Sequence, residues 1–147
     1  MPRAIIVYGS TTGSTELLAG YVAKGMNEAG VDVTVLNVTD VDVEELLDYD
    51  IIFLGSSTWG EGELQDDFIG FYDDMEGLSL QGKKAAAFGP GDGSYDMFCE
   101  AVNLLEDRLL ACGAKIIAPG LKIDGDVVAA ENAAQDWGRQ AAGAIRT

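Results

Sequence analysis

The sequence predicts an α/β protein in which helices cover both faces of a five-stranded parallel sheet, a doubly wound fold. Short apolar runs recur five times within the 147 residues. Each run is followed by a turn rich in Gly, Ser or Asp and then by a longer amphipathic stretch, the pattern of repeated β/α units. Most of the runs are almost continuously apolar, which is typical of parallel strands covered on both faces.

The apolar runs define the expected strands. The second run alternates apolar and polar residues, as an edge strand does, and the other four do not. Right-handed crossovers between parallel strands then place helices on both faces of the sheet. The expected strands span residues 4–8, 31–38, 51–54, 85–88 and 115–118.

Apolar residues at helical spacing predict a helix after each strand. The first helix is expected over residues 17–29, because Gly30 is a good C-terminal stop. The second is short, over residues 43–47, with Asp40 or Asp42 as its N-cap. The remaining helices are expected over residues 68–75, 98–109 and 130–145.

The composition limits the possible functions. Nine Lys and Arg residues against 25 Asp and Glu residues give a net charge of −16. Such a charge disfavours nucleic acid and anionic membranes as partners and favours proteins with basic patches. The sequence has no histidine. This excludes a His general base, a Ser–His–Asp triad and a His-ligated metal site, and we expect no metal.

The chain is expected to be one domain spanning residues 1–147, monomeric and cytoplasmic. No linker, repeat or low-complexity segment divides it. No apolar run is long enough for a signal peptide or a membrane span. Two cysteines, Cys99 and Cys112, are too few for a disulfide scaffold or a Cys-only zinc site.

The loop after the first expected strand, residues 9–16, is rich in hydrogen-bond donors. It carries five hydroxyl side chains and leads into a helix N-terminus, which together favour a bound phosphate. The loop has no Lys or Arg, so neutral donors and the helix dipole would hold the anion. The spacing matches neither a P-loop nor a dinucleotide fingerprint. The alternative is that these hydroxyls only cap the helix and fill a turn.

Two later loops carry one aromatic residue each. Trp59 follows the third expected strand, and Tyr95 follows the fourth within a glycine-rich segment. Strand ends of a doubly wound sheet meet at its ligand-binding edge, and a flat aromatic face suits stacking on a planar ring. For Trp59 the alternative is an indole that covers the sheet edge. Together the three loops favour a planar heterocycle that carries one phosphate.

Four motifs, in this order along the chain, resemble the short-chain flavodoxins of sulfate-reducing bacteria. They are Ser10-Thr-Thr-Gly-Ser-Thr15, Ser57-Thr-Trp-Gly60, Leu64-Gln-Asp-Asp-Phe68 and Gly91-Asp-Gly-Ser-Tyr95, and the resemblance covers nearly the whole chain. It implies a sheet order of 2-1-3-4-5, for which flavodoxins are themselves a standard example. It also implies noncovalent FMN and low-potential one-electron transfer between redox proteins, by shuttling between semiquinone and hydroquinone, without substrate turnover.

The resemblance also assigns roles to residues. The segment from Ser10 to Thr15 would hold the FMN phosphate, Thr58 to Gly60 would flank the inner side of the isoalloxazine, and Tyr95 would stack on its outer face. Gly91 and Asp92 would line the pyrimidine edge. The complete set of expected cofactor-binding residues is Ser10, Thr11, Thr12, Gly13, Ser14, Thr15, Ser57, Thr58, Trp59, Gly60, Pro90, Gly91, Asp92, Tyr95, Phe98 and Cys99.

Acidic residues are expected around the same rim. Their charge would make the reduced cofactor strongly reducing and would attract redox proteins with basic patches, whereas the alternative is that they only keep the surface soluble. They are Glu61, Glu63, Asp66, Asp67, Asp92 and Asp96.

Three other function classes make different demands on the same residues. A phosphoacceptor receiver domain is excluded, because it needs acidic residues where Gly9-Ser10 and Ser56-Ser57 stand. A quinone-reducing flavoenzyme would oxidise NAD(P)H by itself, and a non-redox phospholigand module would ignore FMN. The flavoenzyme and the phospholigand module remain open at this point.

Three further features are interpreted as structural. Cys99 and Cys112 lie in apolar helical patterns and are expected to be buried. Trp137 has core spacing on the last helix, and residues 124–126 are expected to form a turn before that helix.

Overall fold

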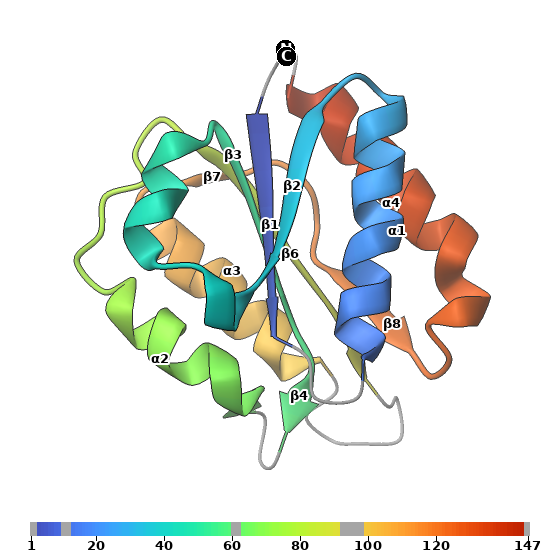
Figure 1. Cartoon of the computed structure of the whole chain (residues 1–147), viewed down its shortest axis with the longest axis horizontal. Coiled ribbons are helices and arrows are strands. Elements are labelled where there is room, and N and C mark those ends of the chain that lie inside the picture. The colour runs from blue at the N-terminus through green and yellow to red at the C-terminus, as the bar shows by residue number, and fades with distance from the viewer. Residues whose placement is uncertain (1–2, 10–12, 60–62, 92–98, 146–147) are drawn as a thin grey trace.

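The computed structural model describes residues 3–9, 13–59, 63–91 and 99–145, apart from the side chains of Trp59 and Glu63. Among these residues a parallel sheet lies between two layers of helices (Figure 1). Its strand order is β2-β1-β3-β6-β7, and β8 pairs with the other end of β6. Counted over the five expected strand regions, this is the order 2-1-3-4-5, so the predicted fold is confirmed.

The elements alternate along the chain as expected. The strands of the main sheet are β1 (Arg3–Gly9), β2 (Asp32–Asn37), β3 (Ile51–Ser56), β6 (Lys84–Gly91), β7 (Lys115–Ile116) and β8 (Leu121–Asp124). A separate hairpin consists of β4 (Thr58–Trp59) and β5 (Glu63–Leu64). The helices are α1 (Ser14–Glu28), α2 (Asp66–Asp74), α3 (Glu100–Ala111) and α4 (Glu131–Ile145), and the 3-10 helices are η1 (Val38–Asp40), η2 (Val43–Asp48) and η3 (Val128–Ala130).

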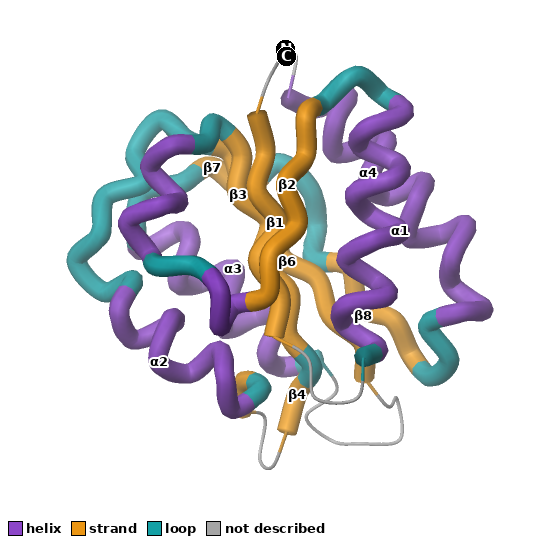
Figure 2. The backbone as a smooth tube through the Cα atoms, viewed as in Figure 1, coloured by secondary structure: helices purple, strands orange, loops and turns teal. Residues whose placement is uncertain are grey.

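The core lies on both faces of the sheet, because successive strand residues point to opposite faces. On one face Ile5 packs with residues of α2 and α3 such as Phe68 and Leu105. On the other face Ile6 packs with residues of α1 and α4, including Trp137. Figure 2 shows the strands between these two helical layers. Trp137 is therefore a core residue, as predicted.

The prediction of one fifth strand over residues 115–118 is wrong in one respect. In its place the chain forms two short strands, β7 (Lys115–Ile116) and β8 (Leu121–Asp124). β7 pairs with the beginning of β6, and β8 pairs with its end. Pro119 lies between them and has no N–H to donate to a strand ladder. Its carbonyl oxygen accepts the indole N–H of Trp137 at 2.9 Å, so this segment bonds to α4.

Two other local predictions are resolved by hydrogen bonds. Asp42, rather than Asp40, begins the short helix η2, and its N–H donates to the Glu45 carboxylate at 2.7 Å in a capping box. The expected turn at residues 124–126 is present, and the Asp126 carboxylate accepts the N–H of Val128 at 3.0 Å.

Among the described residues, no helix combines the length and apolar character needed to cross a bilayer.

Candidate cofactor site

The strands β1, β3 and β6 end at the same edge of the sheet, called here the carboxyl edge (Figure 1). Gly9 at the end of β1 lies opposite Ser56 at the end of β3, and β6 continues to Gly91. From β1 the chain crosses to β2 on one side, whereas β3 lies on the other side of β1. The strand order reverses at this point, which is where doubly wound sheets bind ligands.

Helix α1 begins at this reversal without a side-chain cap. Its N-cap residue, Gly13, has a φ of +91°, a left-handed conformation that favours glycine. Thr15 in the first turn is only 1% exposed, so its hydroxyl is buried where the helix begins. The first N–H groups of any helix lack acceptors within the helix, and the helix dipole adds partial positive charge there.

These groups fit the phosphate of the expected FMN. A helix N-terminus and neighbouring hydroxyls supply donors to phosphate oxygens, and each bond to a charged oxygen contributes about 1.5–3 kcal/mol. Because residues 9–16 contain no Lys or Arg, the sequence supplies only neutral donors there. Ser10, Thr11 and Thr12, which are predicted to complete this set, lie outside the described residues.

The segment after β3 is fixed by two buried polar residues. The Ser56 hydroxyl accepts the N–H of Gln65 at 3.0 Å and donates to the carbonyl oxygen of Ser57 at 2.8 Å. The Gln65 side chain in turn accepts the N–H of Asp67 at 3.0 Å and so caps α2. These bonds hold both ends of the β4–β5 hairpin, which carries Thr58, against the sheet.

The end of β6 forms the third part of the site. Pro90 and Gly91 are its last residues and pair with β8, so the strand extends beyond the predicted residue 88. The Cys99 thiol donates to the carbonyl oxygen of Gly89 at 3.6 Å. Burial raises the pKa of Cys99 to about 11, so the thiol stays protonated and remains a donor. The prediction that Cys99 is a buried structural cysteine is confirmed.

Charge is distributed unevenly between the two edges of the sheet. Within the described part of the chain, Lys122 on β8 is the one cation at the carboxyl edge, where it pairs in register with Gly89. Four others, Arg3, Lys83, Lys84 and Lys115, lie at the amino ends of strands. Acidic residues at the carboxyl edge stand in the first turns of helices and at the end of β8, and they include Glu16, Asp66, Asp67, Glu100, Asp124 and Glu131. Added negative charge is therefore disfavoured at this edge.

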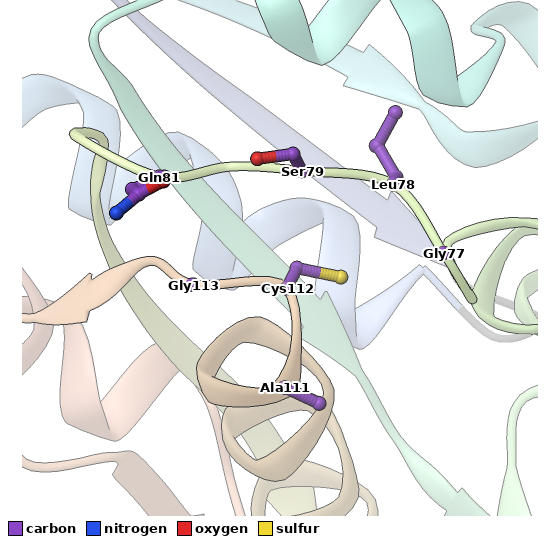
Figure 3. A pocket seen from close by; sticks show the side chains of 7 residues that line it. All are labelled: Gly77, Leu78, Ser79, Gln81, Ala111, Cys112 and Gly113. Atoms are coloured by element: carbon purple, nitrogen blue, oxygen red, sulfur yellow. The ribbon is translucent and has the colours of Figure 1, made fainter.

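A pocket of about 330 Å³ lies at the opposite, amino edge, between the segment that precedes β6 and the end of α3 (Figure 3). Its lining includes Ser79, Gln81 and Cys112, and none of the described residues that line it carries a charge. The Cys112 thiol donates to the carbonyl oxygen of Met75 at 3.3 Å, and burial raises its pKa. Cys112 is thus a packing residue, as predicted, and this pocket is separate from the carboxyl edge.

The described members of the predicted site lie together at the ends of β1, β3 and β6. They are Gly13, Ser14, Thr15, Ser57, Thr58, Pro90, Gly91 and Cys99, with Trp59 described in its backbone only. Gly60, Asp92, Tyr95 and Phe98, together with the three hydroxyl residues before Gly13, lie outside the described residues.

Sequence reasoning missed the hydrogen bonds that support this site. Ser56 and Gln65 bond to each other across the hairpin, and Thr58 accepts the N–H of Ala101 at 2.9 Å. The motif that contains Gln65 was a signal for a capped helix, since Gln at an N-cap is followed by acidic residues in the first turn. No local pattern indicated that Thr58 bonds to α3.

Comparisons with known proteins agree with this geometry. The flavodoxin family model matches residues 6–137. A flavodoxin from Maridesulfovibrio salexigens is 52% identical over 129 residues, which cover 86% of this chain and 88% of that protein. A flavodoxin from Nitratidesulfovibrio vulgaris is 46% identical over 129 residues, covering 86% of this chain and 87% of its own length.

Solved structures give the same result. A Streptococcus pneumonia TIGR4 flavodoxin superposes with a TM-score of 0.89 at 35% identity, covering 98% of this chain and 97% of that one. Oxidised flavodoxin 1 from Bacillus cereus has a TM-score of 0.89 at 33% identity, covering 96% and 97%. The chain therefore belongs to the flavodoxin family, whose members bind FMN and carry electrons between redox proteins without turning over a substrate of their own.

Proposed function

We propose that this chain is a low-potential one-electron carrier in the cytoplasm, acting as a monomer in which residues 1–147 form a single FMN-binding domain. When bound, FMN supplies reversible one-electron chemistry, here between its semiquinone and hydroquinone states. The observation that carries the proposal is the start of α1. A left-handed glycine, Gly13, begins this helix at the point where the strand order reverses.

The phosphate is assigned to the loop from Ser10 to Thr15. Main-chain N–H groups and hydroxyls bind and orient it, while the helix dipole replaces a cationic side chain. A cation at this position would favour a more negative cofactor, so a neutral donor set is consistent with a low potential.

The ring is assigned to the segments that follow β3 and β6. Ser57, Thr58, Trp59 and Gly60 would line one side of it. Tyr95 would stack on the other side, and Pro90, Gly91, Asp92, Phe98 and Cys99 would surround its edge. The support for this assignment is that the described members of the set lie at adjacent strand ends.

The acidic carboxyl edge would lower the potential. One carboxylate about 10 Å from the ring, at an effective dielectric constant of about 20, disfavours an added electron by ~1.7 kcal/mol. This corresponds to about 70 mV for one electron. Salt screens each contribution, but several carboxylates act in the same direction.

The same edge would select the partners. Proteins with basic patches would be attracted over several ångströms and oriented toward the cofactor, so electron exchange would be fastest at low ionic strength. The cations at the amino edge would disfavour docking in the reverse orientation.

The test is a visible spectrum of the purified protein during stepwise reduction at controlled potential. We expect one FMN per chain, two separated one-electron steps, and no oxidation of NAD(P)H by the protein alone. Added salt should slow electron transfer to a basic redox protein. A colourless protein that does not bind FMN, or one that accepts two electrons in a single step, would contradict the proposal.

A further inference from the structure

Helix α3 begins without a cap of its own. Its N-cap residue, Cys99, has φ 51° and ψ 29°, a left-handed conformation that is uncommon outside glycine. The Cys99 side chain makes no capping bond to the helix, and its thiol is engaged with Gly89. The Val102 N–H bonds to the Cys99 carbonyl oxygen at 3.0 Å, so it is the N–H groups of Glu100 and Ala101 that need acceptors from outside the helix.

Thr58 supplies one of these acceptors from a distant part of the sequence. Its hydroxyl oxygen accepts the N–H of Ala101 at 2.9 Å, across 43 residues of chain. Ala101 has no exposed surface, so water does not reach this N–H. Loss of the acceptor would leave a buried donor without a partner, which is more costly than loss of an exposed hydrogen bond.

Thr58 is itself held in place from both directions. It pairs with Leu64 in the β4–β5 hairpin, and Leu64 is buried. Ser56, two residues before it, is bonded to Gln65, the residue after Leu64. The hairpin therefore holds Thr58 in place at the edge of the sheet, and the Thr58 hydroxyl bonds the first turn of α3 to that edge.

The bond joins two parts of the chain that adjoin the segments to which the proposed function assigns the ring. Thr58 directly precedes Trp59 and Gly60, which the proposed function places on one side of the ring. Ala101 lies two residues after Cys99, and Cys99 comes directly after the segment that carries Tyr95. If the ring lies where the proposed function assigns it, the Thr58–Ala101 bond links the residue before Trp59 to the helix that follows the segment carrying Tyr95.

We propose that Thr58 is a positioning residue that controls FMN affinity and the two one-electron potentials through its bond to Ala101. The inference rests on the proposed function for the location of the ring. It concerns the hydroxyl group of Thr58 and is independent of any contact between the Thr58 backbone and FMN.

The experiment compares four variants at two positions. Thr58→Val keeps the side-chain shape and removes the acceptor, Thr58→Ser keeps the acceptor, and Thr58→Cys replaces it with a weaker one. Thr34→Val, in the edge strand β2, is the matched control for the same isosteric change. The measurements are amide exchange at Ala101 in the apoprotein, the FMN dissociation constant and both potentials.

In Thr58→Val we expect Ala101 to exchange about fivefold faster or more, as for loss of an N-cap. The FMN dissociation constant should rise by a similar factor, and the separation of the two potentials should change. Thr58→Ser should restore all three values, Thr58→Cys should be intermediate, and Thr34→Val should match the wild type.

Several outcomes would overturn the inference. Unchanged exchange at Ala101 in Thr58→Val would show that the hydroxyl is not the cap. Faster exchange with unchanged FMN affinity and potentials would limit Thr58 to a structural role. If Thr58→Val does not fold, the inference requires Thr58→Cys to differ from Thr58→Ser in the same direction, and equality refutes it. A wild-type protein that fails to bind FMN would refute the proposed function, whereas exchange at Ala101 would still report on the bond.

Discussion

Replacing Gly25 by alanine tests the contact between α1 and α4 near the C-terminal end of α1. A Cβ atom at Gly25 would lie 2.1 Å from the carbonyl oxygen of Gln135 on α4 and 2.9 Å from its carbonyl carbon. On α4, a Cβ at Gly138 would lie 2.5 Å from the carbonyl oxygen of Val22 on α1. The two helices therefore meet backbone to backbone, and no side-chain rotation can relieve the clash.

The sign of the effect follows from two opposing terms. Alanine stabilises a helix interior by about 0.8–1.0 kcal/mol relative to glycine. Overpacking costs typically about 1–3 kcal/mol, and a contact with main-chain atoms belongs near the upper end of this range. We expect Gly25→Ala to lower the free energy of unfolding by about 1–2 kcal/mol.

Gly20 on the same helix provides the matched control. It is exposed, and a Cβ there would meet no atom within 4 Å. Gly20→Ala should therefore raise the free energy of unfolding by up to about 1 kcal/mol, as helix propensity alone predicts. Urea unfolding of the apoproteins measures both values. If Gly25→Ala is as stable as the wild type or more stable, the close approach of α1 and α4 is refuted.

Two further predictions concern titratable groups. Because burial raises the pKa of Cys99 to about 11 from 9.0, its thiolate should be ~100-fold scarcer near pH 8 than that of an unperturbed thiol. Alkylation followed by mass spectrometry should then modify Cys99 no faster than the protein opens, and modification at the rate of a free thiol would contradict its burial. Burial also raises the pKa of Glu106 above 4.5, so its ionised form is disfavoured in the folded state. The ionised carboxylate therefore lowers the stability of the fold fully above the folded pKa and not at all below the unfolded pKa. Glu106→Gln should be more stable than the wild type at neutral pH, and this difference should disappear in acid. Unfolding curves at several pH values would show a constant difference if this reasoning is wrong.

The sheet was predictable from the sequence because its strands are buried on both faces. Runs such as residues 4–8 and 51–54 are apolar throughout, and apolar runs of that length between turn residues are typical of central parallel strands. The hairpin of β4 and β5 was not predictable, because each strand has only two residues and no periodicity can be read from two. The division of the fifth strand depends on the bond between Pro119 and Trp137, which are 18 residues apart.

The residue types of the candidate site could be predicted from the sequence, but the long-range contacts that hold these residues in place could not. Hydroxyls and glycines between a buried strand and a helix favour a bound phosphate, and the predicted residues Gly13 and Thr15 lie where α1 begins. That they hold a phosphate stays a prediction. The bond from Ala101 to Thr58 and the contact of Gly25 with Gln135 join parts of the chain that only the folded sheet brings together. Such contacts leave no local pattern, because each partner alone is an ordinary threonine, alanine or glycine.

A substitution at Gly13 can test the phosphate assignment apart from its effect on the stability of the fold. Gly13 has φ +91° and Gly77, after α2, has φ +84°, and a Cβ at either position would meet no atom within 4 Å. Alanine at either residue therefore causes conformational strain alone, of roughly 1–2 kcal/mol. The two variants should lose similar stability as apoproteins. Because the turn at Gly13 aims the first N–H groups of α1, only Gly13→Ala should also weaken FMN binding, as measured by fluorescence titration. Equal FMN dissociation constants for the two variants would place the phosphate away from α1.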